Sequence, residues 1–450
     1  MTAPTVSQSR PVPALAKARP PKLPSVAERT LDNGLRVLAV RRPGVPLVEL
    51  RLRVPFAGPS GKKQEAHTAQ AQLLGDTMLL GTERRDAARI AVDLQGLGGQ
   101  LNATVDADRL GMGGSVLATG LPGLLTLLGE LLTSASYPKD DVVGERDRLV
   151  QELAIYRSQP AVLAREALLH RLYGDHPYGR DLPTAEAVEG VKPSQLRALH
   201  AKRVAPQGSV LVLVGDLPPA RLIALVESAL AGWTTVSPAA TTPALPTPEV
   251  GPALLVDRPG AVQTTIRMAR PVPSRTAPDF AALSLANLVF GGYFSSRWVA
   301  NIREDKGYTY SPHAVIEHPP AGSRLTLSAD VTTGVTGPSL LETSYELGRV
   351  ATVPVAQDEL DQARRYAIGS LALGTSSQAG LASTLSLLAG SGLGVEWLRD
   401  HPKALAAVTV DDVLAAGEAY LAPTTFTTVL VGDAEQVAGQ VGAVTPFVTG

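Results

Sequence analysis

An internal repeat constrains the fold of this chain more than any other feature. The segments "VKPSQLRALHAKRVAPQGSVLVLVGD" and "VTVDDVLAAGEAYLAPTTFTTVLVGD" end at Asp216 and Asp433. Both contain Ala-Pro and close on Val-Leu-Val-Gly-Asp. Each predicts a helix, a turn marked by proline, a buried strand and a Gly-Asp turn. Such repetition indicates two similar halves, each about half of the chain.

The fold class follows from the segments around the repeat. Strand-like runs such as "LRVLAV" and "VELRLRV" alternate with helical patterns such as "DVVGERDRLVQELAIYRS". This mixture predicts an α+β fold with two homologous halves, each a largely antiparallel sheet packed with helices. Two such halves would form a clam-shell around a chamber, and ligands often bind between domains.

The expected domain boundaries follow composition. We expect a flexible N-terminal tail over 1–25, an N-terminal half over 26–235 and a C-terminal half over 251–450. The stretch between the halves, 236–250, is rich in threonine and proline and has the composition of a semi-rigid linker.

Composition excludes several classes of function. The 450 residues carry a formal net charge of −1, so there is no electrostatic case for nucleic acid as a partner. The sequence contains no cysteine, which excludes a thiolate nucleophile or a thiolate metal site. The uncharged run Leu110–Gly129 contains several glycines and a proline, so it predicts a strand, a turn and a helix start, not a membrane span. The first 26 residues show no apolar signal-peptide region, and we expect a cytoplasmic protein.

Several motifs together resemble one enzyme family. They are "LDNGLRVLAV", "GLGGQLNATVDADR", "GERDRLVQEL", "GDHPYGRDLPTAEAVEGV" and "GGYFSSRWVANIREDKGYTYS". In this order they resemble the pitrilysin/insulinase family of zinc metallopeptidases, in particular its two-half members related to mitochondrial processing peptidase. The resemblance covers nearly the whole chain and implies the clam-shell fold and a peptide substrate.

The metal motif of that family is degenerate in this chain. Active members carry His-x-x-Glu-His on a helix, where two histidines at i and i+4 hold zinc and the glutamate acts as base, with a distal glutamate ligand. Alignment on the Gly-Thr pair after this helix places the motif on Gln72, Gly75 and Asp76. Glu152 takes the place of the distal ligand, and Glu145 precedes it on the same helix. We therefore expect no metal to be bound by this chain.

No other cluster replaces the lost ligands. His67, His313 and His318 are not paired with a carboxylate at the spacing that a helical zinc site needs. The two glutamates of the distal helix have Arg146 and Arg148 as neighbours, so an ion-paired helix face is their simplest interpretation.

The second half keeps a different part of the family's site. "NIREDKGYTYS" places Arg303 and Tyr310 seven positions apart with Gly307 between them. In the resembled family such a pair reaches the substrate beside the metal, and guanidinium and phenol are suitable donors for a carbonyl and its developing oxyanion. The alternative is that Arg303 pairs with a neighbouring acid and Tyr310 is a half-buried strand residue.

A third motif predicts a docking edge for substrate. Gly98-Gly99 should turn the chain into an edge strand that contains Asn102 and Ala103. In the resembled family this strand pairs with the extended substrate, which needs backbone groups and small side chains. A hairpin without a ligand is the alternative. "HPYGR", from His176 to Arg180, is interpreted as a structural loop in which His176 makes hydrogen bonds.

The resemblance implies the zinc-less subunit of a heterodimeric metallopeptidase. A homologous partner subunit would carry His-x-x-Glu-His and the zinc, and this chain would supply Arg303 and Tyr310. One alternative is a catalytically inactive structural or peptide-recognition subunit, as the family provides in the respiratory cytochrome complex. A self-sufficient hydrolase is a weaker alternative, because the sequence has no recognisable nucleophile elbow.

Overall fold

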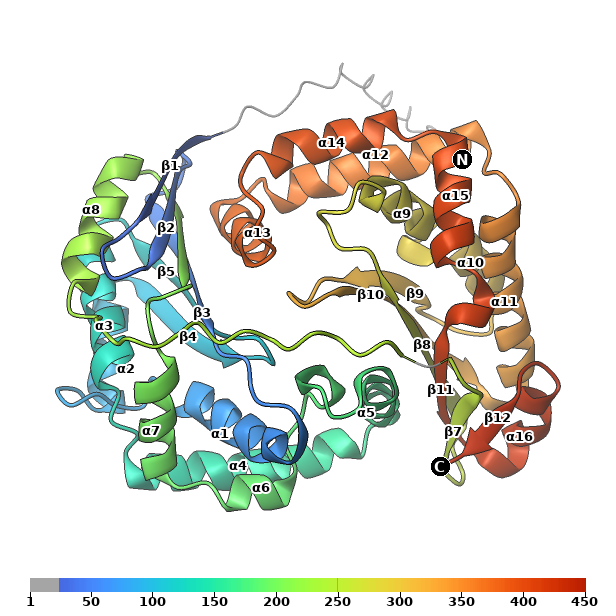
Figure 1. Cartoon of the computed structure of the whole chain (residues 1–450), viewed down its shortest axis with the longest axis horizontal. Coiled ribbons are helices and arrows are strands. Elements are labelled where there is room, and N and C mark those ends of the chain that lie inside the picture. The colour runs from blue at the N-terminus through green and yellow to red at the C-terminus, as the bar shows by residue number, and fades with distance from the viewer. Residues whose placement is uncertain (1–23, 249) are drawn as a thin grey trace, which may run out of the picture.

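Two six-stranded sheets organise the chain (Figure 1). The computed structural model describes residues 24–248 and 250–450. The first sheet has the order β1-β2-β6-β3-β5-β4, with bounds Ser25–Thr30, Arg36–Arg41, Val210–Gly215, Leu47–Pro55, Arg109–Leu117 and Gly99–Val105. The second has the order β12-β7-β11-β8-β10-β9, with bounds Phe447–Thr449, Ala253–Asp257, Thr427–Gly432, Gln263–Val272, Ser323–Thr332 and His313–Glu317.

The repeated segments occupy equivalent places in the two sheets. In the first sheet β6 lies between a parallel neighbour, β2, and an antiparallel one, β3. In the second sheet β11 lies in the same way between β7 and β8. Both repeat strands are buried over most of their length, as their hydrophobic runs predict. The predicted α+β fold with two similar sheets is confirmed.

Helices surround both sheets. In the first half they are α1 (Gln64–Thr77), α2 (Ala87–Gly96), α3 (Leu121–Ser134), α4 (Lys139–Arg157), α5 (Pro160–Tyr173), α6 (Ala185–Glu189), α7 (Pro193–Arg203) and α8 (Pro219–Leu230). In the second half they are α9 (Phe280–Asn287), α10 (Arg297–Val299), α11 (Thr336–Thr352), α12 (Gln357–Gly374), α13 (Gln378–Gly390), α14 (Trp397–Ala407), α15 (Val410–Tyr420) and α16 (Ala434–Gly442). Short 3-10 or π turns cover Gly61–Lys63, Pro177–Gly179, Leu288–Gly292, Ala300–Asp305, Thr333–Val335 and Pro423–Thr425.

The two halves exchange one helix each. Helix α13, from the second half, packs on β6 and β3 of the first sheet, while α5 of the first half packs on β11 and β8 of the second (Figure 1). Leu385 of α13 and Leu172 of α5 are each 1% exposed in these contacts. Full burial of such a side chain contributes about 1.5–3 kcal/mol, so the exchanged helices hold the halves together through apolar contacts.

The segment between the sheets is extended and crosses from one half to the other (Figure 1). Ala240 forms an isolated bridge with Phe56, the hydroxyl of Thr242 donates to Asp108, and His176 Nε2 lies 3.0 Å from the carbonyl oxygen of Pro243. The division of the chain at 236–250 stays a prediction, and most of the predicted tail over 1–25 lies outside the described residues.

The uncharged run over 110–129 forms part of β5, a turn and the start of helix α3, as predicted. Among the described residues, no helix combines the length and the apolar character needed to cross a bilayer.

Candidate functional site

Helix α1 brings Gln72 and Asp76 to one face, where they bind each other. The Nε2 of Gln72 donates to both carboxylate oxygens of Asp76, at 3.1 Å each. Burial raises the pKa of Asp76, and the hydrogen bond from Gln72 opposes this shift. The face that i and i+4 ligands would use is therefore closed by an amide–carboxylate pair.

One arginine forms ion pairs with two glutamates on helix α4. The Nε of Arg148 donates to Glu145 Oε2 at 2.8 Å, and its Nη1 donates to Glu152 Oε1 at 2.5 Å. The hydrogen bond to Glu145 is the main reason that the pKa of Arg148 is raised. Arg148 also acts on Asp76 by lowering its pKa. The two glutamates thus form an ion-paired helix face with Arg148, as predicted, whereas Arg146 pairs with Asp147.

Gly75 occupies the place of the catalytic base, and a side chain there would crowd Val105. A Cβ at this position would lie 2.9 Å from Val105 Cγ2 on β4. Real Cβ atoms essentially never approach so closely. Helix α1 therefore packs directly on β4 through this glycine.

These residues do not fit zinc. Over 24–248 and 250–450, no group of three or more His, Asp or Glu side chains is arranged to hold a metal ion. His67 lies five positions before Gln72 and packs against Phe56, with 5.9 Å between the ring centroids, and burial lowers its pKa. Gln72, Asp76 and the two glutamates already satisfy one another or Arg148, so a metal ion would have to break these contacts.

Arg303 and Tyr310 lie together on the second half. The guanidinium of Arg303 lies 4.2 Å from the centroid of the Phe294 ring and 5.3 Å from that of Tyr310. Gly307 has φ 65°, a left-handed conformation that favours glycine and turns the chain between the two residues. Arg303 Nε also lies 3.3 Å from Glu304 Oε1.

The Arg303 stack is open to solvent. Tyr310 is 83% exposed and Phe294 is 59% exposed. The interpretation of Tyr310 as a half-buried strand residue is therefore wrong, while the pairing of Arg303 with a neighbouring acid is present. Phe294 was not predicted. Its place in "GGYFSSRW", next to the segment that carries the arginine, was the available signal.

The predicted edge strand is present. β4 is the outermost strand of the first sheet, and Asn102 and Ala103 pair with Gly113 and Met112 on its one neighbour, β5. Gly98 before it has φ 59°. The side chain of Asn102 covers Gly113, where a Cβ would lie 2.8 Å from Asn102 Oδ1. The free edge of β4 has unpaired backbone groups that could bind an extended peptide.

The HPYGR loop is structural, as expected for its geometry. His176 Nδ1 accepts from the backbone N–H of Tyr178 at 3.1 Å. The hydroxyl of Tyr178 donates to Asp108 at 2.8 Å and accepts from the backbone N–H of Ala321 at 3.1 Å. This loop therefore connects the β4–β5 hairpin of the first half to the second half.

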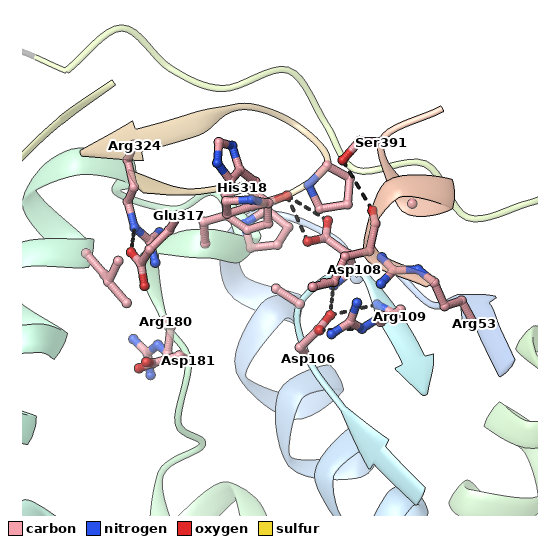
Figure 2. Close-up of a pocket in the computed structure, with 18 of the residues that line it drawn as sticks. Arg53, Asp106, Asp108, Arg109, Arg180, Asp181, Glu317, His318, Arg324 and Ser391 are labelled. Atoms are coloured by element: carbon pink, nitrogen blue, oxygen red, sulfur yellow. Dashed lines mark hydrogen bonds and ion pairs between the residues drawn. The ribbon is translucent and has the colours of Figure 1, made fainter. Parts of the chain in front are cut away.

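A cavity of about 300 Å³ lies beside this loop, between the halves (Figure 2). It shares Arg53, Arg109 and Leu387 with a groove that runs past Asn102 on the first sheet. It also shares the segments 106–107 and 180–181 with the cavity at Gln72. The sequence predicted a chamber between the halves but not the residues that line this cavity, because they come from segments far apart along the chain.

Known proteins share this architecture. Two protein-family models match the sequence of this chain. The family described as "Insulinase (Peptidase family M16)" matches residues 60–186, and the family described as "Peptidase M16 inactive domain" matches residues 190–366. An uncharacterised zinc protease of Mycobacterium leprae is 28% identical over 65% of this chain and 66% of its own length. One of Streptomyces coelicolor is 24% identical over 88% of this chain and 87% of its own.

Two solved structures superpose closely. A peptidase M16 inactive domain from Pseudomonas fluorescens has a TM-score of 0.82 and 25% identity, and the match covers 91% of this chain and 98% of that one. A protease from Helicobacter pylori has a TM-score of 0.81 and 18% identity, and the match covers 91% of this chain and 100% of that one. The fold, the order of motifs and these matches agree: the chain belongs to the pitrilysin/insulinase (M16) family of peptidases, as a member that lacks the zinc motif.

Proposed function

We propose that this chain is the zinc-less subunit of a heterodimeric peptidase. Its partner is a homologous chain with His-x-x-Glu-His that holds the catalytic zinc, and the substrate is a peptide or an unfolded segment. This chain contributes Arg303 and Tyr310 to the partner's site, where they hold the substrate carbonyl and stabilise the negative charge that develops on its oxygen. The hydrolytic chemistry belongs to the partner.

One contrast carries this proposal. The metal half of the site is closed, because Arg148 forms ion pairs with Glu145 and Glu152 of α4 and Gly75 packs on Val105. The other half is open, because Arg303 lies near the exposed rings of Phe294 and Tyr310. Within the described residues, the hydroxyl of Tyr310 makes no hydrogen bond. An exposed phenol, beside a guanidinium whose acidic partner is its exposed neighbour Glu304, suits a ligand from outside the chain.

The decisive experiment is a native pull-down of this chain from its host, with identification of the co-purifying chain and a zinc count. The proposal expects a homologous chain with His-x-x-Glu-His and about one zinc per heterodimer, the stoichiometry of a single catalytic site. If the chain emerges alone or as a metal-free homodimer, it is instead a structural or peptide-recognition subunit.

Two substitutions test the roles of the exposed pair. In the assembled enzyme, Arg303→Ala or Tyr310→Phe should lower peptide turnover by roughly tenfold to a thousandfold, the scale for loss of an oxyanion donor. Tyr345→Phe is the matched control, because Tyr345 is a 56% exposed tyrosine on α11 with Arg349 at 5.6 Å from its ring. Normal turnover by both test variants would remove Arg303 and Tyr310 from the mechanism.

A further inference from the structure

The cavity between the halves is strongly charged (Figure 2). Its lining includes six arginines and four carboxylates: Arg53, Arg109, Arg165, Arg180, Arg275, Arg324, Asp106, Asp108, Asp181 and Glu317. His318 also lines it, and burial, with a smaller contribution from Arg275, lowers the pKa of His318 to about 3. This histidine is therefore neutral at pH 7, and arginines outnumber carboxylates in the lining.

The carboxylates are already engaged. Asp106 pairs with Arg109 at 2.8 Å, Asp181 pairs with Arg165 at 2.5 Å, and Glu317 pairs with Arg324 at 2.5 Å. Asp108 accepts hydrogen bonds from the hydroxyls of Tyr178 and Thr242. Each of these acids therefore already has a cationic or hydroxyl partner within the chain.

Arg180 pairs with Glu65 at 3.4 Å. Of the six arginines in the lining, this leaves Arg53 and Arg275 without an acidic partner among the described residues. The Nε of Arg275 is buried and has no hydrogen-bond partner, and its guanidinium lies 5.6 Å from the centroid of the Trp397 ring. The guanidinium of Arg53 lies close to Gly390, where a Cβ would be 2.4 Å from its Nη2. A half-buried guanidinium with unmade hydrogen bonds is costly unless an anion completes them.

The surroundings indicate which anion. Arg53 also lines the groove that contains Gln100, Asn102 and Thr104 of β4. A peptide extended along β4 would therefore pass the mouth of the central cavity. A volume of about 300 Å³ accommodates a side chain or a chain terminus and excludes a folded domain.

We propose that the cavity binds a peptide carboxylate, with Arg53 and Arg275 as its hydrogen-bond donors. The carboxylate belongs to an Asp or Glu side chain or to the C-terminus of the peptide. Planar guanidinium groups match the two oxygens of a carboxylate. The inference rests on the proposed function for the presence of a peptide in the chamber, and it adds a preference for acidic segments that the Arg303–Tyr310 pair does not itself supply.

Binding to the isolated chain tests this site without a partner. The probes are three nine-residue Ala/Ser peptides: one with a central Glu and an amidated C-terminus, one with Gln in place of Glu, and the Gln peptide with a free C-terminal carboxylate. Isothermal titration calorimetry at pH 7 and physiological salt should show that at least one carboxylate peptide binds about tenfold or more tightly than the amidated Gln peptide, the scale of a charge-assisted hydrogen bond. Tighter binding of the Glu peptide would identify an acidic side chain as the source of the carboxylate, and tighter binding of the peptide with the free carboxylate would identify the C-terminus.

Substitutions assign the preference to the cavity. Arg53→Gln and Arg275→Gln should each reduce it at least severalfold, and Arg275→Lys should retain part of it because the charge remains. Arg84→Gln, at an exposed arginine outside the cavity, should leave it unchanged. Circular dichroism checks that each variant folds. Arg53 and Arg275 lie on different segments, so Arg53→Gln can still test the site if Arg275→Gln misfolds.

Three results would overturn the proposal: equal affinity for all three peptides, an unchanged preference in the Gln variants, or inorganic phosphate that binds as tightly as the best peptide. The last would mean a site for small anions. These failures are separable from a failure of the proposed function. A chain that prefers carboxylate peptides but never assembles with a zinc-bearing partner refutes the heterodimer alone, whereas an enzyme sensitive to Arg303→Ala but indifferent to carboxylates refutes this site alone.

Discussion

The packing of Gly75 on Val105 makes a quantitative prediction about stability. Gly75 is buried inside helix α1, and a Cβ there would lie 2.9 Å from Val105 Cγ2. Gly144 lies inside helix α4, is exposed and would place its Cβ in open space. Gly75→Ala and Gly144→Ala are therefore the same chemical change in two helices, with and without a steric clash.

The two terms can be compared in magnitude. Alanine stabilises a helix interior by about 0.8–1 kcal/mol relative to glycine. At position 144 this gain should be complete. At position 75 the overpacking against Val105 costs about 1–3 kcal/mol. We expect Gly144→Ala to raise the free energy of unfolding by about 1 kcal/mol, while Gly75→Ala leaves it unchanged or lowers it by up to about 2 kcal/mol.

Urea unfolding followed by circular dichroism measures both changes. The same substitution in a Val105→Ala variant isolates the clash. There, Gly75→Ala should raise the free energy of unfolding by about 1 kcal/mol, because the crowding methyl group of Val105 is gone. If Gly75→Ala in the native background stabilises the protein as much as Gly144→Ala does, the close packing of α1 on β4 is refuted. The explanation for the missing base would be refuted with it, since a glutamate at position 75 must also begin with a Cβ.

Two further predictions concern pH and the contact between the halves. Burial is the main cause, and the positive charge of Arg275 the second cause, that lowers the pKa of His401 to about 4. The pKa of His318 is lowered to about 3 for the same two reasons. Because the unfolded chain takes up these protons near pH 6.5 and the folded chain does not, these histidines should cost stability as pH falls from about 6.5 towards 4. The double variant His318→Gln/His401→Gln should flatten this loss in thermal unfolding curves at pH 4–7, whereas His313→Gln, at an exposed site, should not. Leu385→Ala and Leu172→Ala should each destabilise the protein by about 2–5 kcal/mol, and equal calorimetric transitions in variant and native protein would show that the exchanged helices do not hold the halves together.

The sequence by itself predicted the architecture, because the signals involved are local. The two Val-Leu-Val-Gly-Asp segments predict buried strands from their own hydrophobic runs, and they lie in equivalent places as β6 and β11. The Gly-Gly turn before Asn102 predicts the edge strand in the same way. The loss of the metal motif also needs no structure, since zinc chemistry depends on which side chains stand at i, i+3 and i+4 of one helix.

Exposure depends on tertiary neighbours, and here the local interpretation was incomplete. The spacing of Arg303 and Tyr310 predicted a pair but not that Phe294 completes the stack or that Tyr310 is 83% exposed. Alternation along a strand can suggest which face is buried, but it does not say what covers that face. Only the packed chain decides whether a tyrosine at the end of a turn is covered.

The lining of the central cavity and the exchange of α5 and α13 were decided by the tertiary structure alone. Arg53 and Arg275 belong to different halves, and nothing in the sequence near either residue indicates the other. They line one cavity because α13 crosses the first sheet and the linker folds across the β4–β5 hairpin. Local periodicity determines which face of an element is apolar. Packing of the whole chain determines where faces from distant segments meet. The candidate site for a carboxylate lies at such a place, because it brings together arginines from both halves of the chain.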